Sequence, residues 1–232
     1  MTRKNSPNTS PVWNIWQGIL LILIITLVEV PLGWLNNQQD LGRVTGLLSF
    51  VAASLGDCLL YFVVIALFLR LIKCSWRDLG FVAARRRSHY TLGIICGVVL
   101  FIVIGALGNL LQQMIGTPAP QPFAEAVIGV EHDWEYILLL LLGSVAAPLK
   151  EEMIFRGLLY PALRSALGVW KGILLSGVIF AALHFDLIRF LPLFLGGVML
   201  TWLYERTKSI WPCVLAHGTW NMLMALALWL QR

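Results

Sequence analysis

The sequence predicts an all-α, polytopic membrane protein with about seven transmembrane helices and a polar site inside the membrane. Of its 232 residues, 59% are hydrophobic and only 12% are charged, whereas about 25% are charged in a soluble domain. Apolar runs long enough to cross a bilayer recur along the chain. One cluster of ionisable residues, between Lys150 and Arg156, interrupts an apolar stretch. Carboxylates are costly inside hydrocarbon, so this cluster marks a functional site.

The N-terminal half is predicted to hold a tail and three spans. Residues 1–12 are polar and predict a disordered tail, and residues 13–135 predict transmembrane helices with their loops. The three apolar runs lie at 13–34, 47–72 and 91–115. Trp13, at the start of the first run, is typical of an interfacial anchor.

The C-terminal half, residues 136–232, predicts four further spans. They begin at Tyr136 and at the runs 172–185, 187–204 and 210–230. The total is therefore seven, or eight if residues 157–167 form a separate element.

Loop charges predict the orientation. The 70–89 loop carries six basic residues against one acidic residue, whereas the 116–135 loop carries four acidic residues and no lysine or arginine. By the positive-inside rule the first loop is cytoplasmic, and so are the N-terminus and the opening of the site. The net charge of +5 lies in short loops, which does not indicate nucleic-acid binding. The four cysteines lack C-x-x-C spacing, so neither disulfides nor a cysteine metal cluster is expected.

Three polar patterns lie in the predicted C-terminal spans. They are Glu151-Glu152-x-x-x-Arg156, Phe180-x-x-x-His184 and His217-x-x-x-Asn221. Residues four apart share a helix face, so Glu152 can pair with Arg156, and His217 points the same way as Asn221. Glu151 is rotated by about 100° from its neighbour and has no local partner. These positions predict that one glutamate is held and the other reacts.

Depth along the spans agrees for two of the motifs. Glu151 follows Tyr136 by about 22 Å of helix and His217 follows Ile210 by about 10 Å, so both are expected in the cytoplasmic half of the bilayer. His184 follows Lys171 by about 20 Å, which is too deep to meet them unless the helix tilts or enters the membrane later than Lys171. Because helix boundaries err by several residues, the chemistry that pairs His184 with Glu151 is preferred over this depth.

The chemistry of these side chains suggests hydrolysis. A carboxylate and an imidazole that converge on one water form a general-base pair, and a second imidazole with an amide can stabilise an oxyanion. The same Glu, His, His set could instead hold a divalent metal that activates the water. The spacing of the residues does not decide between the two.

The three motifs resemble those of the CPBP family of intramembrane proteases, which includes type II CaaX prenyl endopeptidases and bacterial bacteriocin-processing or immunity proteins. The resemblance covers about 142–225 and marks 136–232 as a catalytic core. It implies an endopeptidase that cleaves membrane-associated peptides or proteins, prenylated or lipid-embedded, within the bilayer. The implied roles are water activation by Glu151 with His184, oxyanion stabilisation by His217 with Asn221, and support from Glu152 and Arg156.

Cofactor use is open in this resemblance, because the family is described both as metalloproteases and as metal-independent glutamate proteases. A divalent ion such as zinc would be held by Glu151, His184 and His217. Two other functions compete with proteolysis. A non-catalytic membrane-binding or immunity protein could keep the same fold, and a proton-coupled transporter could use intramembrane acids. The internal repeats with broken helices typical of transporters are not found in the sequence.

Overall fold

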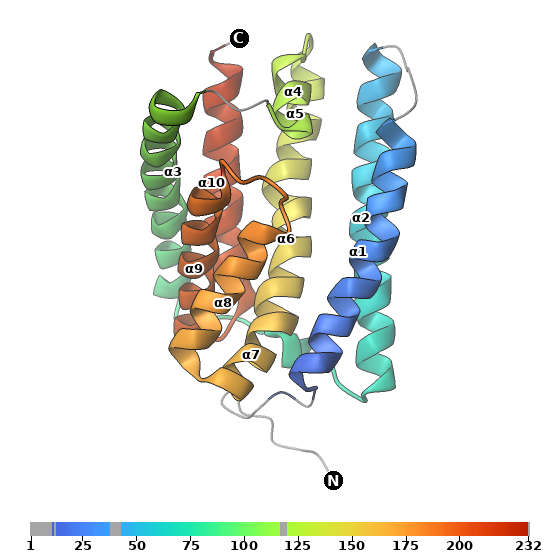
Figure 1. Cartoon of the computed structure of the whole chain (residues 1–232), viewed down its shortest axis with the longest axis vertical. Helices are drawn as coiled ribbons and strands as arrows, with labels where there is room; N and C mark the ends of the chain where they lie inside the picture. Colours follow the sequence, from blue (N-terminus) through green and yellow to red (C-terminus); the bar gives the residue numbers. More distant parts are fainter. Residues whose placement is uncertain (1–10, 12, 38–42, 117–119, 232) are drawn as a thin grey trace.

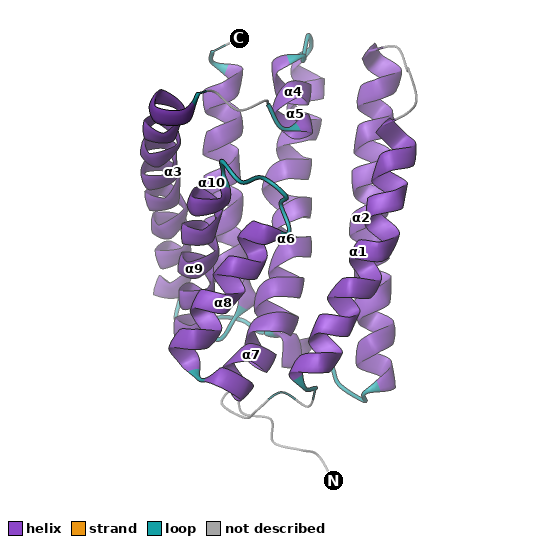
Figure 2. Cartoon of the chain, in the orientation of Figure 1, coloured by secondary structure: helices purple, strands orange, loops and turns teal. Residues whose placement is uncertain are grey.

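The computed structural model describes residues 11, 13–37, 43–116 and 120–231, and these residues form helices without any strand (Figures 1 and 2). The predicted all-α class is confirmed. The predicted tail at 1–12 lies outside the described residues except for Pro11. The elements are α1 (Ile15–Asn37), α2 (Arg43–Leu71), the 3₁₀ turn η1 (Trp76–Leu79), α3 (Ser88–Ile115), α4 (Pro122–Ile128), α5 (Asp133–Leu141), the π-helix η2 (Leu142–Ala146), α6 (Ala147–Glu152), the π-helix η3 (Met153–Leu159), α7 (Tyr160–Leu167), α8 (Val169–Ala182), α9 (Phe190–Thr207) and α10 (Ile210–Trp229).

The long helices follow one axis, with the start of α1 and the end of α10 at opposite ends of the molecule (Figure 1). Within the described residues, α2 and α3 are long and apolar enough to cross a membrane, judged by length and composition, while α8 and the described apolar part of α1 are shorter. The seven predicted spans correspond in position to α1, α2, α3, the α5–α7 segment, α8, α9 and α10, and their number stays a prediction. Residues 157–167 continue η3 into α7 without a break, so they are not a separate element.

Helices α1 and α2 lie side by side at one edge of the bundle (Figure 1). Trp13, just before α1, is only 2% exposed, and its indole Nε1 donates a hydrogen bond to the carbonyl oxygen of Leu158 at 2.9 Å. The prediction that Trp13 is an interfacial anchor is therefore wrong. An indole N–H at the end of an apolar run needs an acceptor, and here a backbone carbonyl of the protein supplies it.

The central segment, residues 133–167, is one continuous helical path through α5, η2, α6, η3 and α7. Each of its two π-helical stretches ends just before a proline, η2 before Pro148 and η3 before Pro161. Proline has no N–H and its ring crowds the carbonyl four residues earlier, so the wider π turn relieves the preceding backbone. The N–H of Ala147 accordingly donates to the oxygen of Leu142, five residues back.

Helix α10 packs closely on α3 through glycines. A Cβ atom added at Gly97 would lie 2.4 Å from the carbonyl oxygen of Ala216, and one at Gly93 would lie 2.5 Å from that of Pro212. Small residues four apart let two helix backbones approach each other in this way. Ala216 precedes His217, so this contact helps to set the place where the His217 side chain enters the bundle.

Helices α8 and α9 form a hairpin that ends part-way along the bundle (Figure 1). The 14 residues of α8 extend about 21 Å at ~1.5 Å per residue. The two helices approach closely, because a Cβ atom at Gly197 would lie only 2.9 Å from the Cα atom of Gly177. The turn of this hairpin carries His184.

A charged cluster joins α7 to the end of α9. Tyr160 Oη donates to Glu205 Oε2 at 2.6 Å, Arg164 Nε lies 3.0 Å from the same oxygen, and Lys208 Nζ lies 2.5 Å from Oε1. Partial burial raises the pKa of the Glu205 carboxyl, but the hydrogen bonds from Lys208 and Tyr160 and the nearby positive charges outweigh it and hold this pKa below its ordinary value. The ionised carboxylate therefore fastens this end of the fold.

Candidate active site

Glu152 and Arg156 form a buried ion pair, as their spacing predicts. Arg156 Nη1 lies 2.9 Å from Glu152 Oε1, and neither side chain is exposed. Arg156 Nη2 also donates to the carbonyl oxygen of Gly197 at 3.2 Å, and its guanidinium carbon lies 4.9 Å from the centre of the Phe180 ring. Buried charges persist only with such partners. The Glu152 carboxylate is therefore held in place by the surrounding helices.

His217, on α10, connects this pair to Glu151. Its Nδ1 lies 2.9 Å from Glu152 Oε1, and its Nε2 lies 3.8 Å from Glu151 Oε2. Because a carboxylate paired with Arg156 only accepts hydrogen bonds, the proton between Nδ1 and Glu152 belongs to the imidazole. The imidazole also stacks on Trp220, with ring centres 5.6 Å apart. Nε2 is thus the nitrogen that His217 presents to Glu151.

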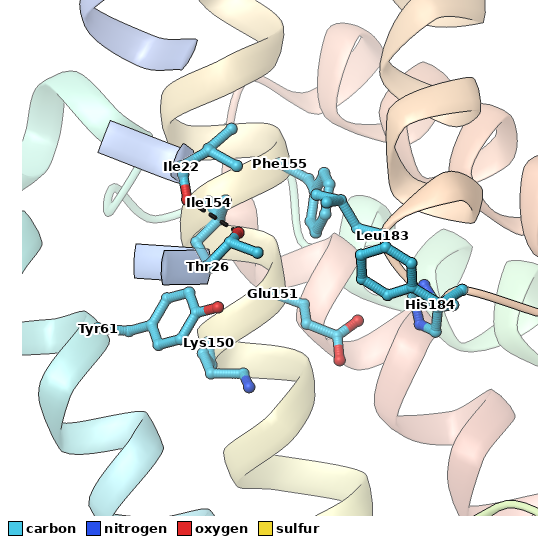
Figure 3. Close-up of a pocket in the computed structure, with 10 residues that line it drawn as sticks. Ile22, Thr26, Tyr61, Lys150, Glu151, Ile154, Phe155, Leu183 and His184 are labelled. Carbon is cyan, nitrogen blue, oxygen red and sulfur yellow. Dashed lines mark hydrogen bonds between the residues drawn. The ribbon is translucent and has the colours of Figure 1, made fainter. Parts of the chain in front are cut away.

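Glu151 borders a cavity of about 340 Å³ (Figure 3). Its side chain is 22% exposed, in contrast with the fully buried Glu152. Its Oε2 is buried and has no hydrogen-bond partner among the described residues. The two adjacent glutamates therefore differ in the way the sequence predicts, with Glu152 tied to Arg156 and Glu151 facing open space. The cavity wall is mostly apolar, and its members are Ile22, Thr26, Tyr61, Lys150, Glu151, Ile154, Phe155, Leu183, His184 and Phe185.

His184 lies on the wall of the same cavity as Glu151 (Figure 3). Its Nδ1 lies 2.7 Å from the carbonyl oxygen of Phe180, which can only accept, so Nδ1 carries the proton. In the neutral imidazole Nε2 then has a free lone pair. The next residue, Phe185, has a left-handed backbone with φ of 52°, a conformation that ends α8 and turns the chain at the cavity.

The structure explains why the depth estimated for His184 did not fit that of Glu151, although the chemistry pairs the two residues. The helix that carries Glu151 continues to Leu167, and the chain reverses at Gly168, which has a positive φ of 82°. Glu151 precedes Gly168 by 17 residues and His184 follows it by 16, so the two side chains reach about the same level. The sequence estimate counted from Lys171 and so left out the length of α7.

Asn221 takes a different position from the other predicted site residues. It lies one turn beyond His217 on α10, and both side chains contact the central segment, in agreement with the predicted common face. Its Nδ2 donates to the carbonyl oxygen of Gly143 at 2.9 Å, in η2. Neither Asn221 nor His217 lines the cavity that Glu151 and His184 border, but His217 Nε2 lies 3.8 Å from Glu151 Oε2.

Lys150, next to Glu151, makes contacts that the sequence interpretation missed. Its Nζ lies 2.5 Å from Asp57 Oδ2 on α2 and 4.7 Å from the centre of the Tyr61 ring. From the sequence, Asp57 is interpreted as a structural or interfacial residue. The sequence interpretation did not predict that Asp57 pairs with Lys150. The sequence did contain a signal for this pair, because Asp57 and Lys150 each lie in an apolar run, and opposite charges in such runs tend to pair. The pair neutralises the lysine charge and joins α2 to α6 beside Glu151.

The predicted metal-ligand set does not form a metal centre in this geometry. Glu151 and His217 approach to 3.8 Å, and His184 lies on the cavity wall. Across the described parts of the chain, no three His, Cys, Asp or Glu side chains come together in a way that could hold a metal ion. Zinc in proteins takes three or four such ligands at about 2.0–2.3 Å. The residues therefore do not fit a zinc ion as they stand.

Comparisons with known proteins show which proteins the chain is similar to. Residues 133–223 match the family model for Type II CAAX prenyl endopeptidase Rce1-like proteins, a range that contains all three motifs. A protein of Bacillus subtilis (strain 168) named "Putative membrane peptidase YdiL" is 25% identical over 228 residues, 92% of this chain and 87% of that protein. The "Uncharacterized 24.3 kDa protein" of Escherichia coli is 29% identical over 126 residues, 52% of this chain and 57% of that protein. No solved structure matches the chain.

Proposed function

We propose that this protein is an intramembrane endopeptidase, because residues 133–223 match the family model for Type II CAAX prenyl endopeptidase Rce1-like proteins. It hydrolyses peptide bonds in membrane-associated proteins or peptides. The observation that carries the proposal is the shared cavity of Glu151 and His184, which is bordered by a partly exposed carboxylate and by a histidine whose Nδ1 is engaged with a backbone carbonyl. General-base activation requires one positioned proton acceptor beside the water molecule, and a second acceptor helps to orient it.

In the proposed reaction, a water molecule between Glu151 and His184 gives a proton to the Glu151 carboxylate as its oxygen attacks the peptide carbonyl carbon. His184 Nε2 accepts the second hydrogen bond of the water and orients it. Negative charge then develops on the carbonyl oxygen, and His217, when Nε2 carries a proton, donates to it. The proton on Glu151 passes to the departing nitrogen, the C–N bond breaks, and a carboxylic acid and an amine are released.

Support for this assignment of His217 comes from its neighbours. Glu152 holds the imidazole through Nδ1, and Arg156 in turn holds Glu152, so the orientation of Nε2 is fixed by two layers of contacts. Such second-layer contacts are how proteins keep a reacting imidazole in position. The resemblance assigns the oxyanion to Asn221 as well, and one of the two N–H groups of its amide donates to Gly143.

The substrate is proposed to enter from the membrane. Apolar side chains from α1, η3 and the end of α8 border the cavity, among them Ile22, Ile154 and Leu183. They suit an uncharged peptide segment or a lipid-embedded one. We further propose seven spans, with the N-terminus and the opening of the site on the cytoplasmic side, as the loop charges predict.

Cleavage by the purified protein tests the function directly. We expect the protein in lipid nanodiscs to cleave members of a panel of membrane-anchored peptides, and His184→Ala to lower the rate by about 10²–10⁴-fold, the contribution typical of a general acid–base group. The exposed His132 provides a matched control, because His132→Ala should leave the rate unchanged. Wild-type rates in the His184 variant would contradict the proposed site, and a complete lack of cleavage across the panel would favour a non-catalytic binding protein.

Chelation tests the metal. Since Glu151, His184 and His217 do not gather into a metal site, we expect peptide cleavage to persist after exhaustive dialysis against a strong chelator. The measurement compares cleavage rates with the metal content of the same sample. If chelation abolishes cleavage and one equivalent of zinc restores it, hydrolysis depends on a metal and the side chains must rearrange to bind it.

A further inference from the structure

One backbone acceptor in the central helix has lost its helical donor. In η2 the hydrogen bonds run five residues back, as from the Ala147 N–H to the oxygen of Leu142. The next bond in this register would run from residue 148 to Gly143, and Pro148 has no N–H to donate. The carbonyl oxygen of Gly143 therefore depends on a donor from outside the helix. A backbone carbonyl at this depth is costly if it stays unpaired.

Asn221 supplies that donor. Its Nδ2 donates to the oxygen of Gly143 at 2.9 Å from the facing helix α10. A second contact on the same face shows how close the two helices are, because a Cβ atom added at Gly218 would lie 2.3 Å from the carbonyl oxygen of Ser144. Helix α10 thus rests on η2 through a glycine without a side chain and an asparagine that replaces a missing backbone donor.

The same face of α10 holds the residue that reaches the reacting carboxylate. His217 lies one turn before Asn221, with Nδ1 2.9 Å from Glu152 and Nε2 3.8 Å from Glu151. Its position relative to α6 depends on how α10 is seated on the central segment. We propose that Asn221 is a positioning residue, whose amide replaces the N–H that Pro148 lacks and thereby seats His217 against the two glutamates. The expected effect of Asn221 on the rate of cleavage rests on the proposed function. The hydrogen bond between Asn221 and Gly143 does not.

This role differs from that of an oxyanion donor in a measurable way. An oxyanion donor acts on the substrate, so its loss lowers the rate whatever residue stands at 148. A positioning amide is needed only while Gly143 lacks a helical donor. Alanine at 148 restores an N–H to the helix, so Asn221 and Pro148 should be coupled, as residues that serve one acceptor are.

Carbonyl chemical shifts test the hydrogen bond without any activity. The sequence contains a single Gly–Ser pair, Gly143–Ser144, so labelling glycine with ¹³C at the carbonyl and serine with ¹⁵N gives one signal for the Gly143 carbonyl. We expect Asn221→Ala to shift this signal upfield, as loss of a hydrogen bond does, and Asn221→Ala in the Pro148→Ala background to shift it less. The exposed Asn109 is the matched control, and Asn109→Ala should not move the signal. A signal that is unchanged in Asn221→Ala overturns the proposal.

A kinetic double-mutant cycle tests the positioning. Asn221→Ala should lower kcat by at least tenfold in the natural sequence and by clearly less in the Pro148→Ala background, with KM unchanged in both. Pro161→Ala, which alters the other π-helical stretch, serves as the control and should show no coupling to Asn221. Equal losses in the two backgrounds identify Asn221 as a direct oxyanion donor and overturn the proposal. If no peptide is cleaved, the proposed function fails, while the carbonyl signal still decides whether Asn221 serves the Gly143 carbonyl. If Pro148→Ala does not fold, an unchanged signal in Asn221→Ala overturns the proposal and an upfield shift supports it.

Discussion

Glu151→Gln is expected to lower kcat for peptide cleavage by about 10²–10⁴-fold, the size of effect typical for loss of a general base. Glutamine has nearly the shape of glutamate but cannot take a proton from water. One oxygen of Glu151 is buried without a hydrogen-bond partner among the described residues, and the side chain borders the cavity. The substitution therefore removes the proton acceptor without opening a void. Steady-state rates on a cleaved membrane peptide give the measurement.

Two controls make this result specific. Glu125, exposed on α4, provides a matched substitution, because Glu125→Gln changes the same charge far from the cavity along the chain and should leave the rate unchanged. The thermal unfolding midpoint of the Glu151 variant should stay close to that of the natural protein. A Glu151→Gln variant that folds and cleaves at the natural rate would rule out this residue as the base.

Arg156→Met is expected to destabilise the fold by about 3–5 kcal/mol, the typical cost of removing one partner from a buried ion pair. Neither Arg156 nor Glu152 is exposed, and the guanidinium also donates to the oxygen of Gly197. Methionine has a similar length but leaves the Glu152 carboxylate without its main partner. Unfolding of the purified protein in mixed micelles with increasing denaturing detergent measures the loss.

A second substitution separates charge from packing. Glu152→Gln in the Arg156→Met background removes the unpaired carboxylate and should recover most of the lost stability. The exposed Arg206 is the control, and Arg206→Met should change stability by no more than about 0.5 kcal/mol. If the double variant is as unstable as Arg156→Met, the loss comes from packing of the arginine stem and the ion-pair explanation is wrong.

Local spacing predicted the contacts within one helix well. The i, i+4 spacing of Glu152 and Arg156 and the common face of His217 and Asn221 both appear in the structure, because they depend only on the 3.6-residue period of the helix. The all-α class followed from composition in the same way. The resemblance to a peptidase family came from motifs, which record chemistry that periodicity cannot show, and residues 133–223 match a family model of that kind.

Contacts between distant segments were harder to predict. The level of His184 depends on where the chain reverses, and α7 extends the preceding helix to Leu167 before the turn at Gly168. Trp13 was expected at the membrane interface, but it donates to Leu158, 145 residues away. The contact of Asn221 with Gly143 arises from a π-helical register that follows from Pro148 together with the packing of α10. Such features depend on tertiary packing, which no local pattern records.

The short hairpin of α8 and α9 affects how water can reach the candidate site. A helix of about 21 Å that starts at one face of a hydrocarbon layer of about 30 Å ends inside that layer. Its turn therefore places irregular backbone at a depth where polar groups cannot face lipid and must border protein or a hydrated recess. Hydrolysis consumes one water molecule per bond, and the turn that carries His184 is where such a recess would reach the glutamate. In the proposed membrane arrangement, the short hairpin lets water, the second reactant of hydrolysis, reach the glutamate.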